Sequence, residues 1–133
     1  MTSLPWSTDT LFVRTHFADE EAWRALAVAV GTPSEDGFLA NLHVVDDPAH
    51  HDLTPARVAA LATGHRLVVV ADRTAMTAPD LPLLVLHRGG AGWEELRVVA
   101  EELWSIENNI SLANMGWEEF TGNADDDGVF RGF

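Results

Sequence analysis

The feature that most constrains the fold is the apolar run Leu67–Ala71, LVVVA, near the middle of the chain. It has three consecutive valines and no polar side chain. A short continuous run of this kind, rich in β-branched residues, is typical of a strand that is covered on both faces. The chain must therefore supply elements that pack on either side of a sheet.

The segments before this run alternate between strand and helix signals. Leu11–Phe17, LFVRTHF, predicts a strand, and Asp19 is a suitable N-cap for a helix that ends near Gly31. Phe38–Val45 predicts a second strand, and Thr54, followed by a proline, predicts the start of a second helix. The order β-α-β-α-β favours parallel strands joined by right-handed crossovers.

The segments after this run predict an antiparallel addition to the sheet. Asp72–Pro82 holds two prolines and no helical stripe, so we expect a loop. Leu83–Leu86 and Glu94–Val99 then predict two strands of a hairpin that turns at Gly89–Gly92.

Two helices are expected at the carboxyl end. Glu101–Glu107 has inward apolar positions at helical spacing, and Asn114–Phe120 predicts a short helix with Asn114 as its N-cap. The sequence thus predicts one α/β domain over residues 1–133. We expect a mixed sheet of about five strands, with a parallel β-α-β-α-β core and an antiparallel hairpin edge, in a three-layer or two-layer sandwich.

Composition excludes several kinds of chemistry. The 133 residues include no Cys, no Tyr and no Lys, and the formal net charge is −13. Thiol nucleophiles, thiolate metal sites and lysine Schiff bases are therefore excluded, and the charge argues against binding of nucleic acid. The start MTSLPWSTDT lacks the features of a secretory signal, and no run is long enough to span a membrane. We expect a cytoplasmic protein that requires no cofactor.

Three aspartates follow predicted strands. Asp46 and Asp47 come after the second strand, and Asp72 comes after the third. Ligands of parallel sheets bind at the carboxyl ends of strands, where such carboxylates could hold a divalent metal. The alternative is that these aspartates cap turns.

Two loops resemble metal-binding sequences in part. His50 and His51, beside Asp52, have residue types that bind zinc, although neighbouring side chains of an extended chain point apart. Asn123–Gly128 follows the first half of a calcium-binding loop, but its last ligand would lie beyond the end of the sequence, and Arg131 occupies a ligand position. A solvated loop and an Asp/Gly turn are the alternatives.

The stretch Glu101–Phe120, EELWSIENNISLANMGWEEF, is the candidate recognition surface. Tryptophan anchors many interfaces, and the asparagine amide both donates and accepts hydrogen bonds. The candidate binding residues are Trp104, Glu107, Asn108, Asn109, Asn114 and Trp117. The alternative is internal, with the tryptophans in the core and the asparagines bonded to the backbone.

The sequence resembles a family through motifs at both ends. These are LFVRTHF with DEEAW at the start, and ELWSIENNISLANMGWEEF with DGVFRGF at the end. Together they resemble a small family of single-domain actinobacterial proteins that is known only as a domain of unknown function. The resemblance covers nearly the whole chain and implies one domain without a defined activity. His16 stands where an acid is expected, so no role is carried over to it.

Three functional hypotheses follow from the sequence. The favoured one is a non-enzymatic protein-binding module of the immunity, inhibitor or accessory type. It would use an acidic surface and the C-terminal helices to bind another protein, and a basic partner fits best. The alternatives are a metal-dependent enzyme that uses Asp46, Asp47 and Asp72, and a homodimeric structural module.

Overall fold

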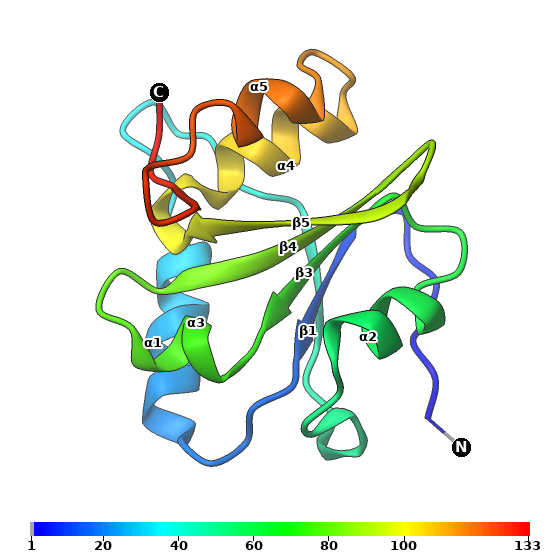
Figure 1. Ribbon diagram of the computed structural model, residues 1–133. Helices are drawn as coiled ribbons and strands as arrows, with labels where there is room; N and C mark the ends of the chain where they lie inside the picture. The colour runs from blue at the N-terminus through cyan, green and yellow to red at the C-terminus, as the bar shows by residue number, and fades with distance from the viewer. Residues whose placement is uncertain (1) are drawn as a thin grey trace.

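The computed structural model describes residues 2–133 and has one mixed sheet between two layers of helices (Figure 1). The strands lie in the order β2-β1-β3-β4-β5-β6. They are β1 (Thr10–Arg14), β2 (Leu42–Val45), β3 (Leu67–Ala71), β4 (Pro82–Gly89), β5 (Gly92–Val99) and β6 (Val129–Phe130). The helices are α1 (Glu20–Val30), α2 (Pro55–Leu61), α3 (Arg73–Thr77), α4 (Leu103–Ser111) and α5 (Trp117–Thr121), with short 3-10 turns at η1 (Pro48–His50) and η2 (Ala100–Glu102).

The sheet has the predicted parallel and antiparallel halves. β1 pairs in parallel with both β2 and β3, and every residue of β3 is buried, as the run of valines predicted. β4 pairs antiparallel with β3 and forms the expected hairpin with β5. The two-residue strand β6 was not predicted and extends the sheet by pairing in parallel with β5.

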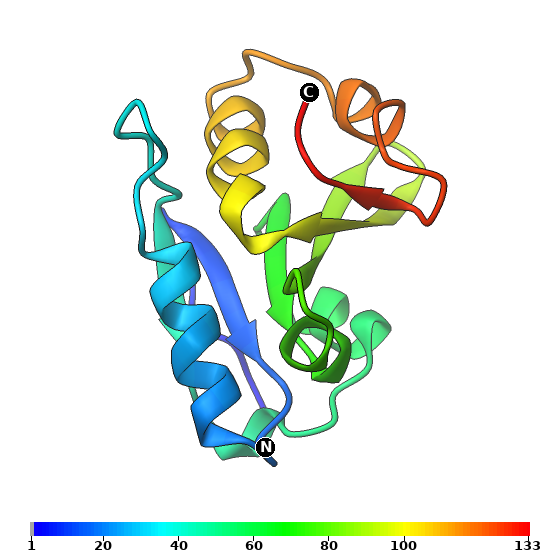
Figure 2. The same ribbon diagram turned by 90° about the vertical axis from the view of Figure 1, so that its left-hand side faces the viewer.

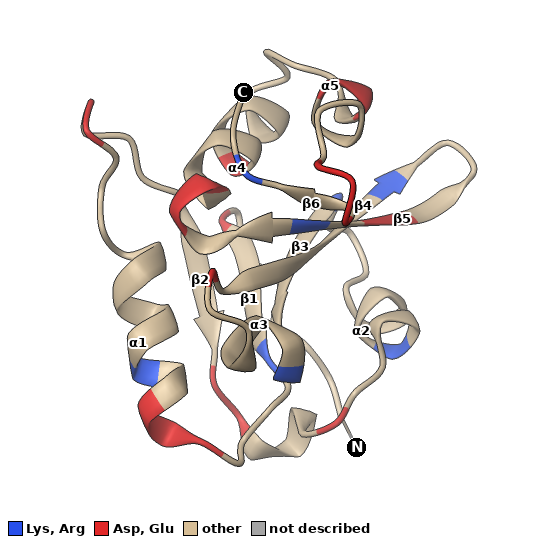
Figure 3. Ribbon diagram, turned by 60° about the vertical axis from the view of Figure 1, so that its left-hand side comes forward, with Lys and Arg blue, Asp and Glu red and all other residues tan. Residues whose placement is uncertain are grey.

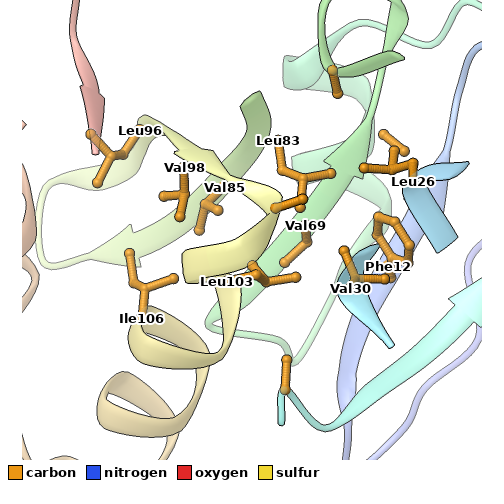
Figure 4. Close-up of a cluster of buried hydrophobic side chains, with 14 of the residues drawn as sticks. Phe12, Leu26, Val30, Val69, Leu83, Val85, Leu96, Val98, Leu103 and Ile106 are labelled. Atoms are coloured by element: carbon orange, nitrogen blue, oxygen red, sulfur yellow. The ribbon is translucent and has the colours of Figure 1, made fainter. Parts of the chain in front are cut away.

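The two faces of the sheet have separate cores, which makes the fold a three-layer sandwich (Figure 2). The larger core lies between the sheet and helices α1, α3, α4 and α5, and it includes Phe12 and Val69 (Figure 4). The smaller core lies between the sheet and α2, where Leu11 and Val68 meet Val58. Because strand side chains alternate, neighbours in β1 and β3 serve opposite cores.

Several predicted helix ends are confirmed. The Asp19 carboxylate accepts from the Ala22 N–H at 3.0 Å, and the Thr54 hydroxyl accepts from the Arg57 N–H at 3.2 Å. Gly31 ends α1 as its C-cap. Within residues 2–133, no helix combines the length and the apolar character that crossing a membrane requires.

Three local predictions are wrong. The expected loop Asp72–Pro82 contains α3, whose five residues are too few to show a helical stripe. Asn114 does not cap the last helix, which begins after Gly116, and the Gly116 N–H donates to the Glu119 carboxylate at 2.7 Å. The second strand starts at Leu42 rather than Phe38, because Phe38 stacks on a tryptophan of α4 instead.

Candidate functional site

Trp117 is a core residue of the C-terminal corner formed by α4, α5 and their connection. Its side chain is 6% exposed, stacks on His87 with ring centroids 4.7 Å apart, and donates from Nε1 to Glu94 at 3.1 Å. Burial lowers the pKa of His87, and the carboxylates of Glu94 and Glu118 oppose this shift. The structure therefore places Trp117 beneath the surface, where it holds α5 to the β4–β5 hairpin.

Glu107, another predicted binding residue, is also internal. Glu107 is 2% exposed, and its carboxylate accepts from the Thr10 hydroxyl at 2.9 Å, the Asn41 N–H at 2.7 Å and the Ser111 hydroxyl at 2.5 Å. These donors come from β1, the segment before β2, and α4 itself. Glu107 thus joins α4 to the start of the parallel strands.

The side chains of Asn108 and Asn109 bond the backbone, as the internal alternative predicted, whereas that of Asn114 does not do so within residues 2–133. The Asn108 amide donates to the Leu39 carbonyl at 2.9 Å, and the Asn109 amide donates to the Ser105 carbonyl at 2.8 Å. The Asn109 carbonyl accepts from the Asn114 N–H at 2.9 Å and so closes the turn after the helix. The Asn114 side chain is exposed and lines a surface groove.

That groove has a volume of about 800 Å³ and lies between the N-terminal segment, residues of β1, β3 and β4, and the α4–α5 connection. Its walls mix opposite charges, with Asp9 and Glu118 beside Arg66. His65 and His87 also line it, but the unpaired nitrogens of their rings, Nε2 and Nδ1 respectively, are buried in the wall. The groove therefore carries charges of both signs.

A second hollow, which we call the acidic cleft, surrounds Trp104 at the other end of α4. Its volume is about 580 Å³. It is lined by Ala29, Thr32, Pro33, Ser34, Glu35, Asp36, Glu101, Glu102 and Trp104, with no Arg or His among these residues. Trp104 is half-buried and stacks on Phe38 with ring centroids 5.2 Å apart. The pKa of Glu102 is raised, mainly by burial and secondly by the negative charge of Glu101. The cleft is therefore a place where negative charge is crowded beside an aromatic ring.

Acidic residues also occur on several other elements, and few basic residues accompany them (Figure 3). The acidic cleft differs from these sites because two pairs of neighbouring acids meet in one hollow. Sequence reasoning missed it. Glu35 and Asp36 lie far along the chain from Glu101 and Glu102, and only the fold of α1 against η2 brings the two pairs together.

The aspartates at the carboxyl edge of the sheet have partners within the chain. Asp46 pairs with the buried guanidinium of Arg14 at 3.1 Å, and Asp47 accepts from the Ala49 N–H at 2.9 Å. Asp72 forms a bidentate pair with Arg97 at 2.8 and 2.7 Å. Asp72 also caps α3 through the Ala75 N–H.

The structure does not combine these aspartates into one site. Among residues 2–133, no three side chains of His, Cys, Asp or Glu form a group that could hold a metal ion. Asp72 lines a hollow of about 270 Å³ with His16 and Asp52, but Asp46 and Asp47 lie outside it. The geometry gives no support to a metal-dependent active site built from these three residues.

The two metal-like loops also have structural roles. His50 is 3% exposed, with its Nε2 2.7 Å from the Ser3 carbonyl, whereas His51 is exposed. In the C-terminal loop Arg131 binds Asp125 at 2.9 Å and Asp127 at 2.7 Å, so an internal cation occupies the place of a metal. The segment is a turn, as the alternative interpretation predicted, and it returns the chain to the sheet at β6, which was not predicted.

The fold and these contacts define a small acidic α/β domain whose polar residues are mostly engaged in holding its elements together. The family model described as "Domain of unknown function (DUF6924)" matches residues 9–133. The chain therefore belongs to the DUF6924 family, and one domain accounts for nearly its whole length. No curated protein matches the chain. The actinobacterial source suggested by the sequence motifs stays a prediction.

Proposed function

We propose that this protein is a binding module that recognises a basic protein through the acidic cleft. The observation that carries the proposal is the convergence of four carboxylates and Trp104 on one hollow without a basic side chain in its lining. Asp46, Asp72 and the C-terminal loop, in contrast, have internal partners in Arg14, Arg97 and Arg131. The acidic cleft is thus the place where an external cation gains most.

An arginine of the partner suits the cleft best. The pKa of Glu102 is raised because its carboxylate is partly desolvated and lies near Glu101, so the ionised form is disfavoured. A guanidinium placed there would relieve this repulsion and form charge-assisted hydrogen bonds. Trp104 adds an indole ring, the aromatic group that cations favour most. The cleft therefore combines electrostatic attraction with a surface for stacking.

The charge of the whole molecule supports the same type of partner. A formal net charge of −13 raises the rate of encounter with a basic protein and slows encounter with an acidic one. Such a module acts by covering a basic surface, which fits an inhibitor, immunity or accessory protein. The cytoplasmic setting expected from the sequence forms part of this proposal.

The test is titration of the full chain with a short oligo-arginine peptide at low and at physiological salt. Glu101→Gln/Glu102→Gln removes two charges from the cleft, and Glu21→Gln/Glu95→Gln removes two exposed charges elsewhere. At about 0.5 kcal/mol for each exposed ion pair, the cleft variant should bind about fivefold more weakly than the control. Equal affinities for the two variants would contradict the proposal.

A second variant separates the aromatic contribution from the charge. Trp104→Leu keeps an apolar side chain against Phe38 but removes the indole ring from the cleft. We expect weaker binding of oligo-arginine and a smaller change for oligo-lysine, because guanidinium groups stack on aromatic rings better than ammonium groups do. Unchanged affinity for both peptides would show that Trp104 is not part of the binding site.

A further inference from the structure

We infer that two copies of this chain associate through their β2 strands, so that the two sheets become one. Among the strands of residues 2–133, β2 lies at the edge of the sheet and has β1 alone as its neighbour (Figure 3). An edge strand presents unpaired backbone donors and acceptors that a second strand can satisfy. The β2 edge adjoins the acidic cleft, because Phe38 stacks on Trp104, but the inference does not depend on the proposed function.

The hydrogen-bond pattern identifies the free groups of β2. The Thr10 N–H donates to the Asn41 carbonyl at 3.0 Å. Because backbone groups alternate along a strand, His43 and Val45 also face β1, while Leu42 and Val44 direct their N–H and C=O groups outward. Antiparallel pairing about His43 sets Leu42 of one copy opposite Val44 of the other. Each such pair exchanges both hydrogen bonds, and the arrangement has the two-fold symmetry common in homodimers.

The edge lacks the features that normally prevent pairing. Proteins protect edge strands with charged residues, prolines or bulges, and the segment 37–45, GFLANLHVV, has no Pro and no Asp, Glu, Lys or Arg. Three apolar side chains beside the edge are exposed: Val44 by 52%, Phe38 by 49% and Leu39 by 41%. The opposite edge strand, β6, is only two residues long and is followed by Arg131 and its ion pairs.

The distribution of charge favours a second copy over a basic partner at this edge. The chain carries 21 acidic residues, yet none lies in segment 37–45. A basic protein would find no carboxylate of that segment to bind. Two copies of this acidic chain, in contrast, repel each other least where the contacting surface is uncharged and apolar. The same strand in a second molecule supplies both the backbone groups and the apolar side chains that match.

Sedimentation velocity over a range of micromolar concentrations tests the inference. We expect the mass to rise from 14.5 kDa toward twice that value as concentration increases. Val44→Lys places a charge on the edge and should leave a monomer, whereas Val28→Lys makes the same change at a residue 68% exposed on α1 and should dimerise as the wild type does. A wild-type monomer at all concentrations would overturn the inference.

Hydrogen exchange identifies the surface directly. Dimerisation through β2 should slow exchange of the Leu42 and Val44 amides as concentration rises, while the His43 and Val45 amides, which face β1, change little. A dimer that forms without this alternating protection, or that survives Val44→Lys, would show that another surface is used and would equally overturn the inference.

Discussion

Replacement of Glu107 by alanine should destabilise the protein more than any exposed acid-to-alanine change. The carboxylate lies in the interior and holds three short hydrogen bonds, from Thr10, Asn41 and Ser111. Alanine would leave the backbone N–H of Asn41 and the Thr10 hydroxyl without their acceptor, and it would open a small cavity. The connection between α4 and the start of β1 would be lost.

The size of the effect follows from these contacts. A hydrogen bond to a charged group contributes about 1.5–3 kcal/mol, and the cost of burying the carboxylate offsets part of the sum. We expect Glu107→Ala to lower the free energy of unfolding by about 3 kcal/mol, which corresponds to a fall in Tm of about 10 °C for a domain of this size.

Glu107→Gln should cost only about 1 kcal/mol, since its amide oxygen can accept from Asn41 while its N–H groups donate to the two hydroxyls. Urea unfolding followed by circular dichroism measures these differences, with Glu21→Ala as the control at an exposed position. If Glu107→Ala unfolds within about 0.5 kcal/mol of the wild type, as a surface change would, the assigned role of Glu107 is wrong.

Two further predictions concern titration and the C-terminal turn. Burial lowers the pKa of His87 below 6.5, so the unfolded state binds more protons, and the free energy of unfolding should fall as the pH drops below that value. His87→Phe keeps the stacking on Trp117 but cannot bind a proton. In urea unfolding from neutral to acidic pH, its free energy of unfolding should therefore depend less on pH than that of the wild type. An equal pH dependence in the two proteins would show that other groups cause it. Arg131→Ala should speed hydrogen exchange at Val129, with a smaller effect at high salt, because Arg131 holds the turn and lowers the pKa of Asp127. Exchange that is unaffected at low salt would contradict this role.

Much of the fold was predictable because its strands carry strong local signals. The run Leu67–Ala71 indicated a strand buried on both faces, and Gly89–Gly92 indicated the hairpin. α3 and β6 were missed because they are five and two residues long, and segments this short show no periodic pattern. β6 is a strand because it pairs with β5, which lies far from it in the sequence.

The candidate site was less predictable, because contacts between distant segments decide whether a polar residue is buried or exposed. Glu107 and Trp117 belong to a stretch that suggested a recognition surface, but both are buried. Trp104 is half-buried and lines the acidic cleft, whereas Trp117 is buried and forms part of the wall of the 800 Å³ groove. The acidic neighbours of Trp104, Glu35 and Asp36, come from the other half of the chain, and no spacing in the sequence associates them with it.

The most direct test of the central claim is affinity capture with matched variants of the full chain. Wild type, Glu101→Gln/Glu102→Gln and Glu21→Gln/Glu95→Gln would be immobilised in equal amounts and exposed to a lysate of the source organism. The account predicts a basic protein that the wild type and the control retain, that salt releases, and that the cleft variant retains poorly. Equal retention by the two variants, or no basic protein retained by the wild type, would contradict a binding function for the acidic cleft.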